Sequence, residues 1–200
     1  MRKVLLSALA VVCLFAAGCM TKLMQPTAAP PVTGAVQSDQ AAIVFFRSSG
    51  LGGGVQAPVV ESVDNDVRYV GIVSSKMKLL HKTTPGKHYY VVGGEDANLL
   101  EADLEGGKIY YVDIEPKMGI FKARFIFVPI TAAELSSESF LKDLAACAWY
   151  TNNPEGKAWF DSNYESLKDK KKTAFEKQGR EGAYQKAIII KQYGSATLIQ

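Results

Sequence analysis

Between Ala41 and Ile130 the chain alternates short apolar runs with turn residues. The runs have the length and the β-branched and aromatic content of strands. In residues 98–104 apolar side chains alternate with carboxylates, which predicts a strand with one buried and one solvated face. Seven or eight strands at this spacing indicate a sandwich or a barrel, and we expect a mainly β fold, an antiparallel β-sandwich over residues 41–130. The predicted strands cover residues 42–47, 59–63, 68–73, 78–82, 87–92, 98–104, 108–115 and 121–128.

A helical pattern replaces the strand pattern at Ile130. Thr131 and Glu134 have the spacing of a capping box, and Ile130 and Leu135 occupy the two positions of a hydrophobic staple. We therefore expect a helix that starts at Ala132 and packs on the sandwich. Its apolar face consists of Phe140, Leu141, Leu144, Ala145 and Ala148.

A second helix is predicted from Asn153-Pro154 to Gly179, because Asn is a good N-cap and Pro suits the first helical position. Its charged run over residues 168–172 predicts that this helix projects into solvent. Residues 187–190 fit either a strand or a buried helix. Residues 131–200 thus form a helical C-terminal extension in this interpretation. The apolar stripe of the second helix consists of Phe160, Tyr164, Leu167, Ala174 and Phe175.

The N-terminus has the three regions of a secretory signal. Arg2 and Lys3 are followed by an apolar run over residues 4–17 and by small residues that end at Gly18-Cys19. About 14 apolar residues rise roughly 21 Å as a helix, short of the ~30 Å hydrocarbon core of a bilayer. We expect residues 1–18 to be removed as a signal peptide.

The sequence Phe15-Ala16-Ala17-Gly18-Cys19 resembles the lipobox of bacterial lipoproteins, with Ala16 where leucine is commoner. The resemblance implies that Cys19 is the lipid attachment site, and several acyl chains on one cysteine suffice for stable anchoring. An ordinary secretory signal with an incidental cysteine is the alternative. In Gram-negative bacteria Asp after the cysteine favours the inner membrane. By resemblance to that rule, Met20 favours an outer-membrane lipoprotein that faces the periplasm.

Residues 19–40 are rich in Pro, Ala, Thr and Gln and have no hydrophobic period, so they are predicted to form a flexible tether. The chain without its signal is nearly neutral. Lys and Arg number 23 against 20 Asp and Glu, and removal of the signal takes away two of the cations. No large basic field is left, so we expect no nucleic-acid partner. Cys13 leaves with the signal and Cys19 is acylated, so Cys147 has no partner for an intramolecular disulfide.

Four motifs between Ala41 and Ile130 carry a family resemblance. They are Ala42-Ile43-Val44-Phe45-Phe46-Arg47, Val70-Gly71-Ile72, Pro85-Gly86-Lys87-His88-Tyr89 and Gly107-Lys108-Ile109-Tyr110-Tyr111-Val112. Together they resemble a known bacterial lipoprotein domain, the domain of unknown function 2846. The resemblance implies a small β-sandwich and carries no established activity.

His81 and His88 are the only histidines, and a hairpin at Pro85-Gly86 would bring them together. Zinc usually takes three or four protein ligands, and the sequence offers no companions, so we expect no metal and no cofactor. The glycines of residues 50–54 lack the ending of a phosphate loop. The carboxylates of residues 101–105 share one exposed strand face, where nothing raises a pKa. Cys147 is expected to be a buried, inert thiol. No catalytic residue is predicted.

Paired tyrosines are the remaining candidate feature. Neighbouring residues on a strand point to opposite faces, so one tyrosine of each pair must face away from the core. Either helices cover that face or it forms a binding surface. The candidate surface consists of Tyr89, Tyr90, Tyr110 and Tyr111.

The leading hypothesis is a non-catalytic binding or structural module, anchored in the membrane through Cys19, that binds an envelope protein or a glycan. One alternative is a periplasmic hydrolase that uses His81 or His88, which polar groups converging in one pocket would favour. Another is a membrane-surface or assembly factor that acts through the helix over residues 153–178. Exposure of its apolar stripe would support that alternative, and burial would favour a structural role.

Overall fold

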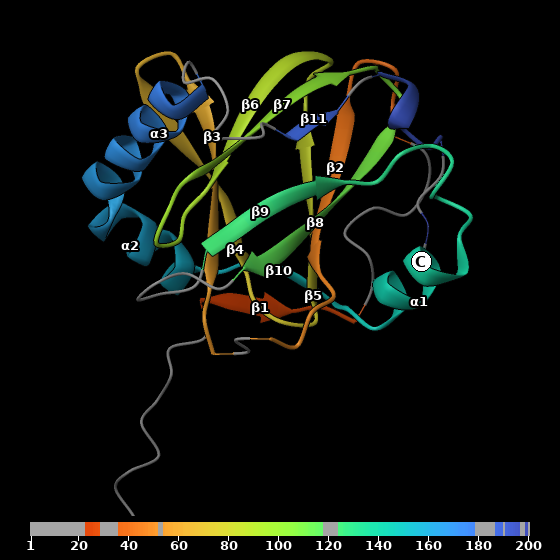
Figure 1. Cartoon of the computed structure of the whole chain (residues 1–200), viewed down its shortest axis with the longest axis horizontal. Coiled ribbons are helices and arrows are strands. Elements are labelled where there is room, and N and C mark those ends of the chain that lie inside the picture. Colours follow the sequence, from red (N-terminus) through yellow and green to blue (C-terminus); the bar gives the residue numbers. More distant parts are fainter. Residues whose placement is uncertain are drawn as a thin grey trace, which may run out of the picture.

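The computed structural model describes residues 23–28, 36–51, 54–117, 124–178, 187–189, 191–196 and 199, which form two facing β-sheets with helices on the outer sides (Figure 1). The six-stranded sheet has the order β1 (Met24–Pro26), β10 (Ala148–Asn152), β5 (Met77–Thr83), β2 (Ala41–Arg47), β8 (Ile109–Lys117) and β9 (Arg124–Pro129). The five-stranded sheet has the order β11 (Ala187–Ile189), β7 (Asn98–Leu104), β6 (Gly86–Val92), β3 (Ala57–Val63) and β4 (Asp66–Val73).

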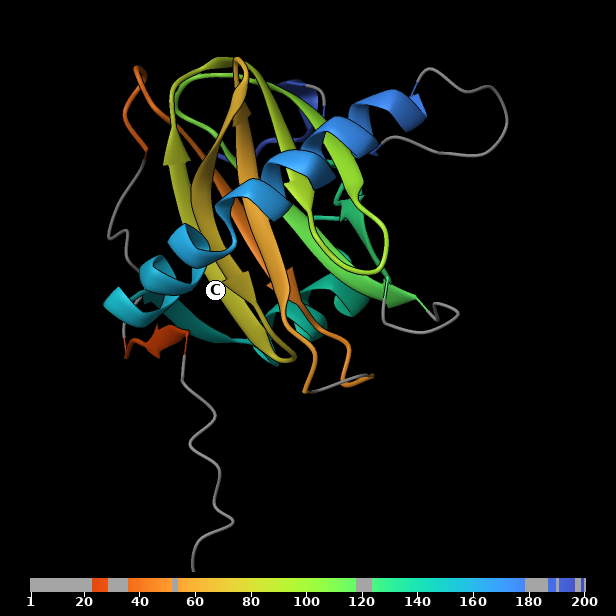
Figure 2. The same ribbon diagram turned by 90° about the vertical axis from the view of Figure 1, so that its left-hand side faces the viewer.

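The main core lies between the sheets, where Phe45 packs edge-on against Tyr90 and tilted against Phe127. A second cluster lies between the six-stranded sheet and α1 (Glu138–Ala145). A third lies between the five-stranded sheet and the helices α2 (Pro154–Ser162) and α3 (Tyr164–Gln178), which cross its outer face (Figure 2). Both outer sheet faces are therefore covered by helices.

The prediction of a mainly β fold is confirmed, and β2 to β9 match the eight predicted runs, apart from residues 121–123, which lie outside the described part. The expectation that the strands are antiparallel is only partly met. Three pairs are parallel: β2 with β8, β5 with β10 and β7 with β11. Two of these pairs include strands from beyond residue 130. Parallel pairing needs a long connection, and β10 and β11 reach the sheets only after the helices that precede them.

The C-terminal segment contains the helices α1, α2 and α3, and it also supplies one strand to each sheet, β10 and β11. It ends in a short 3₁₀ helix, Lys191–Tyr193, and in a bridge from Ser195 to Ile109. Residues 187–189 form a strand, which resolves the choice that periodicity left open.

The tether prediction is wrong for residues 23–26. β1 pairs with β10, and the side chains of Leu23 and Met24 are buried. The sulfur of Met24 lies 3.4 Å from the Ile72 amide. A Cβ at Gly71 would lie 2.7 Å from Leu79 and 3.5 Å from the Met24 methyl group, so a glycine leaves the room that this packing needs. Cys19 and the predicted signal lie outside the described residues.

The first helix begins later than predicted. Glu134 does bond the Thr131 amide and hydroxyl, at 2.8 and 2.7 Å, but these bonds close a turn. Ser137 has an extended backbone and accepts a bond from the Phe140 amide, so it is the N-cap of α1. A second good cap, Ser137, thus displaced the helix start by six residues from the position that the capping box indicated.

Asn153 caps α2 as predicted, with its side chain 2.8 Å from the Gly156 amide. The single predicted helix is interrupted at Asn163, which separates α2 from α3. The predicted helix end, Gly179, lies outside the described residues. The prediction that the helix after Asn153 projects into solvent is wrong, because Phe160 of α2 and Leu167 of α3 are buried against the sheet. Two lysines of the charged run bond backbone carbonyls of the five-stranded sheet and its β6–β7 loop: Lys170 bonds Gly94 at 2.6 Å and Lys171 bonds Asp66 at 3.0 Å.

Candidate functional site

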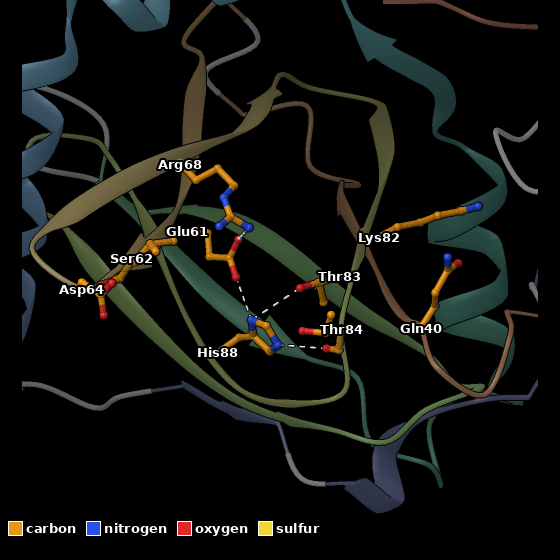
Figure 3. Close-up of a pocket in the computed structure, with 10 residues that line it drawn as sticks. Gln40, Glu61, Ser62, Asp64, Arg68, Lys82, Thr83, Thr84 and His88 are labelled. Carbon is orange, nitrogen blue, oxygen red and sulfur yellow. Dashed lines mark hydrogen bonds and ion pairs between the residues drawn. The ribbon is translucent and has the colours of Figure 1, made fainter.

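Strand pairing defines two ends of the molecule. Thr83 is opposite Ala41, and the β3–β4 turn follows Val63, so the ends of β3 and β5 and the start of β6 share one end, here called the cleft end. A cleft of about 520 Å³ opens there (Figure 3). Its lining residues are Gln40, Glu61, Ser62, Val63, Asp64, Arg68, Lys82, Thr83, Thr84 and His88.

A buried carboxylate forms the centre of this site. The side chain of Glu61 is 4% exposed, although it lies in the apolar stretch of β3. One carboxylate oxygen is 2.7 Å from Nδ1 of His88, and the other is 3.3 Å from Nη1 of Arg68 and 3.9 Å from Nε2 of His81. Figure 3 shows Glu61 between Arg68 and His88. Three nitrogen-bearing side chains thus surround one buried negative charge.

Both sheets supply these residues. Glu61 is opposite Arg68 of β4 and opposite Tyr90 of β6, so its strand neighbours place Arg68 and His88 beside it. His81 comes from β5 of the other sheet. The two histidines therefore converge, but the predicted hairpin does not form. β5 and β6 belong to different sheets, because Thr84-Pro85 carries the chain across the sandwich edge.

The hydrogen bonds of His88 account for both ring nitrogens. Nε2 lies 2.9 Å from the Thr84 carbonyl, which can only accept, so Nε2 carries a proton. One further proton lies between Nδ1 and Glu61. When Glu61 is ionised this proton is on Nδ1, and the contact is an ion pair. His88 then has no free nitrogen for a metal ion or for proton abstraction.

The charge states of the cluster follow from burial and from neighbouring charges. Burial favours the neutral form of Glu61, but the bond from His88 and the adjacent His81 and Arg68 outweigh it and lower the pKa of Glu61 below its usual value. Burial lowers the pKa of His81 to about 4, against the opposing pull of Glu61. Burial also raises the pKa of Tyr90. At neutral pH the site holds an ionised Glu61 and a neutral His81.

One buried polar atom of the cluster, Nε2 of His81, has no hydrogen-bond partner within the described residues, whereas the buried hydroxyl of Tyr90 lies beside Thr83. The Tyr90 ring packs on both imidazoles, with centroid distances of 5.5 Å to His81 and 6.2 Å to His88. A buried polar atom without a partner is costly unless a ligand or water completes it. Across the described part of the chain, no group of three or more acidic, histidine or cysteine side chains is arranged to hold a metal ion.

The candidate tyrosine surface is corrected by the structure. Tyr90 and Tyr110 point into the core between the sheets, and Tyr111 is buried beneath Phe140 of α1 at a centroid distance of 5.3 Å. Tyr89, which is partly buried, packs on Phe175 of α3. Helices therefore cover both outward-facing tyrosines, Tyr89 and Tyr111, and this agrees with the alternative in which helices cover the outer face of the sheet.

The remaining sequence candidates have local roles. Glu101, Asp103 and Glu105 face solvent and pair with lysines at distances of 2.8 to 3.9 Å. Cys147 is buried, and burial raises the pKa of its thiol to about 11. Sequence analysis did not select Glu61 or Arg68. A charged residue inside the run Val59-Val60-Glu61 was the only available signal.

Among the described residues no helix combines the length and the apolar character needed to cross a bilayer. Comparison of the chain with protein-family models, with curated proteins and with solved structures found no match.

Proposed function

We propose that this chain is a lipid-anchored envelope protein, attached to the outer membrane through Cys19, whose β-sandwich binds a polar partner in the cleft without catalysis. The sequence that precedes Cys19 supports the anchor. The buried carboxylate of Glu61, contacted by His81, His88 and the largely exposed Arg68 at an open cleft, supports the binding role and is the observation that carries it. Ionised side chains are rarely buried without a structural or functional reason.

The protonation pattern favours binding over catalysis. A general base needs a free nitrogen or carboxylate oxygen near its target, with a pKa near the working pH. His88 uses both nitrogens in the fold, and His81, with its pKa near 4, is a weak base. Glu61 is already surrounded by donors. The cluster therefore provides a fixed, charged surface at the base of the cleft that a bound partner can contact.

The cleft lining favours a polypeptide segment as the partner. It presents charges of both signs, Arg68 and Lys82 against Asp64, together with hydroxyl and amide groups. Apart from the imidazole of His88, the described lining residues include no ring on which a sugar could stack. An extended envelope protein segment with charged side chains matches this surface, and a glycan is the other outcome of the test.

Site-directed photocrosslinking in intact cells tests the proposal. A photoreactive residue replaces the exposed Thr84 at the cleft, and a matched one replaces the exposed Lys117 on β8. We expect a discrete adduct at position 84 only, degraded by protease and resistant to glycosidases. Adducts with the opposite sensitivity would identify a glycan, and equal labelling at both positions would exclude the cleft. Fatty-acid labelling of the wild type and of Cys19→Ala tests the anchor, and we expect label in the wild type alone.

The convergence of both histidines on Glu61 favours a second candidate, a periplasmic hydrolase. That activity requires His88 to leave Thr84. In this case His88→Gln or His81→Gln would abolish product release from isolated cell-wall sacculi or remove stoichiometric zinc from the purified protein. The proposed binding role predicts that neither variant changes product release or metal content.

A further inference from the structure

The end opposite the cleft, here called the exit end, presents two exposed apolar side chains. Pairing of Arg47 with Met77 and of Ala57 with Val73 places the loop after β2 and the β4–β5 turn together there. The Ser75 hydroxyl donates to the Ser49 carbonyl at 2.9 Å and joins them. Leu51 is 57% exposed and Val55 is 42% exposed. They are two of only four large apolar side chains so exposed in the described part of the chain.

A buried arginine holds the backbone at Leu51 and at Val55. Arg47 is fully buried, and its guanidinium donates to the backbone carbonyls of Leu51 and Val55, the latter at 2.6 Å. The bonded carbonyls thus belong to the two residues whose side chains point outward. Placing a guanidinium in the interior is costly. The bonds that it makes hold the backbone of Leu51 and Val55, whose apolar side chains face water. Such a device suits a loop that is preorganised to contact an apolar surface.

The chain itself indicates what that surface is. β1 lies at the same lower end of the molecule as the β4–β5 turn in Figures 1 and 2. Leu23 is packed into the fold, four residues after Cys19. Four residues span at most about 14 Å when fully extended. A lipid on Cys19 therefore holds β1, and the end of the sandwich on which it lies, within about 14 Å of the bilayer.

We propose that the exit end rests on the membrane, with Leu51 and Val55 in the interfacial layer between headgroups and acyl chains. This inference rests on the proposed lipidation of Cys19. Because the anchor already confines the domain to the surface, insertion of the loop is an intramolecular step, and two apolar side chains suffice. The exposed Lys76 in the bonded β4–β5 turn is placed to meet anionic headgroups. The cleft then faces away from the membrane, toward the periplasm.

Fluorescence quenching on vesicles tests this orientation. The full-length lipidated protein, with Leu51→Cys or Val55→Cys labelled by an environment-sensitive fluorophore, is reconstituted into phosphatidylethanolamine–phosphatidylglycerol vesicles. Asn65→Cys in the β3–β4 turn at the cleft end is the matched control. Protein without an introduced cysteine measures labelling of the buried Cys147. Iodide reports access from water, and nitroxide on the lipid acyl chains reports depth.

We expect iodide quenching at positions 51 and 55 to be about fivefold weaker than at position 65, with acyl-chain quenching at 51 and 55 only. Two labelled positions guard against a variant that misfolds. Iodide access at both positions equal to that at 65 would overturn the inference. The mass of the N-terminal peptide separates the possible failures. An unacylated peptide removes the anchor and this inference with it, whereas an acylated peptide with a water-exposed loop refutes the orientation alone.

Discussion

The two ends of the sandwich each bury a charged side chain, and they use it differently. At the cleft end Glu61 bonds other ionisable side chains, His88 and Arg68, and the result is a polar surface that is open to solvent. At the exit end Arg47 bonds the backbone carbonyls of Leu51 and Val55, and the result is a fixed loop with an apolar surface. The buried Glu61 thus organises ionisable groups at a polar cleft, whereas the buried Arg47 fixes the positions of backbone carbonyls.

This difference affects how each end responds to change. Side chains around Glu61 can gain or lose protons, so the cleft end is sensitive to pH and can adapt to a substitution. Backbone carbonyls only accept hydrogen bonds and do not change protonation state, so the exit end depends on the donors of Arg47. The comparison gives four predictions, ordered by the size of the effect.

Removal of residues 153–200 should have the largest effect, because α2 and α3 support both ends. Lys171 bonds the Asp64 and Asp66 carbonyls at the cleft end, and a Cβ on Gly156 would lie 2.2 Å from the carbonyl of Leu23, so α2 fits closely against the exit end. The cut also uncovers the apolar cluster on the outer sheet face. We expect aggregation and no cooperative thermal transition, measured by circular dichroism.

Two point variants separate docking of the helix from general sensitivity. Leu167→Ala in α3, where the side chain is buried, should lower the free energy of unfolding by about 2 to 5 kcal/mol, and Leu141→Ala in α1, where it is 38% exposed, by well under about 1 kcal/mol. A truncated chain that melts cooperatively would show that α2 and α3 are an independent arm.

The second prediction compares arginines at the two ends. Arg47→Ala leaves two carbonyls without their donor and a cavity beside Phe125, whose ring lies 5.2 Å from the guanidinium. We expect it to lower the free energy of unfolding by about 3 kcal/mol in urea titrations, with Arg47→Lys intermediate. Arg68→Ala, whose side chain is 62% exposed, should cost less than about 1 kcal/mol. Equal losses would contradict the distinction between the two ends.

The third prediction concerns replacement of the buried carboxylate. In Glu61→Gln the amide can donate to Nδ1 of a neutral His88, so the network is repaired in part. We expect a loss of about 1 to 2 kcal/mol, against about 3 kcal/mol for Glu61→Ala, which leaves the His88 nitrogen without a partner. Glu101→Gln, on strand β7 of the same sheet and separated from β3 by β6, is the control and should change the unfolding midpoint little. A loss for Gln as large as that for Ala would mean that the negative charge itself is required.

The sequence allowed prediction of the strands because periodicity and turn residues are local signals. All eight runs between residues 42 and 128 correspond to strands, and Asn153-Pro154 identified a helix start. Pairing was harder to predict, because β10 and β11 join distant strands and leave no local pattern. The same applies to β1, whose three residues belong to a Pro-rich stretch and are held by contacts with Gly71 and Asn152.

The candidate site was not predicted from the sequence. A hairpin at Pro85-Gly86 was the condition under which the two histidines would lie close together; they do converge, but on Glu61 and from two different sheets. The run over residues 168–172 was interpreted as a solvated face. A lysine stem is long enough to lie over a sheet and bond its carbonyls, so charge alone did not show which way the helix faces.

The last prediction is that the two ends contribute to stability with opposite pH dependence. At the cleft end, burial lowers the pKa of His81 from 6.5 to about 4. The unfolded chain therefore binds a proton between these values that the folded chain does not, and His81 lowers stability as the pH falls from 6.5 toward 4. Near the exit end, burial raises the pKa of Asp113 from 3.8 to about 6. The folded chain holds the extra proton there, so Asp113 lowers stability as the pH rises through 4 to 6.

Each contribution is on the order of 2 kcal/mol, and over pH 4.5 to 6.5 they offset one another in the wild type. Urea unfolding of the wild type, His81→Gln and Asp113→Asn across this range separates them, because subtraction of two profiles cancels every group that they share. The difference between wild type and His81→Gln should rise with pH, and that between wild type and Asp113→Asn should fall. If both stability differences changed with pH in the same direction, the two ends would not have opposite pH dependence.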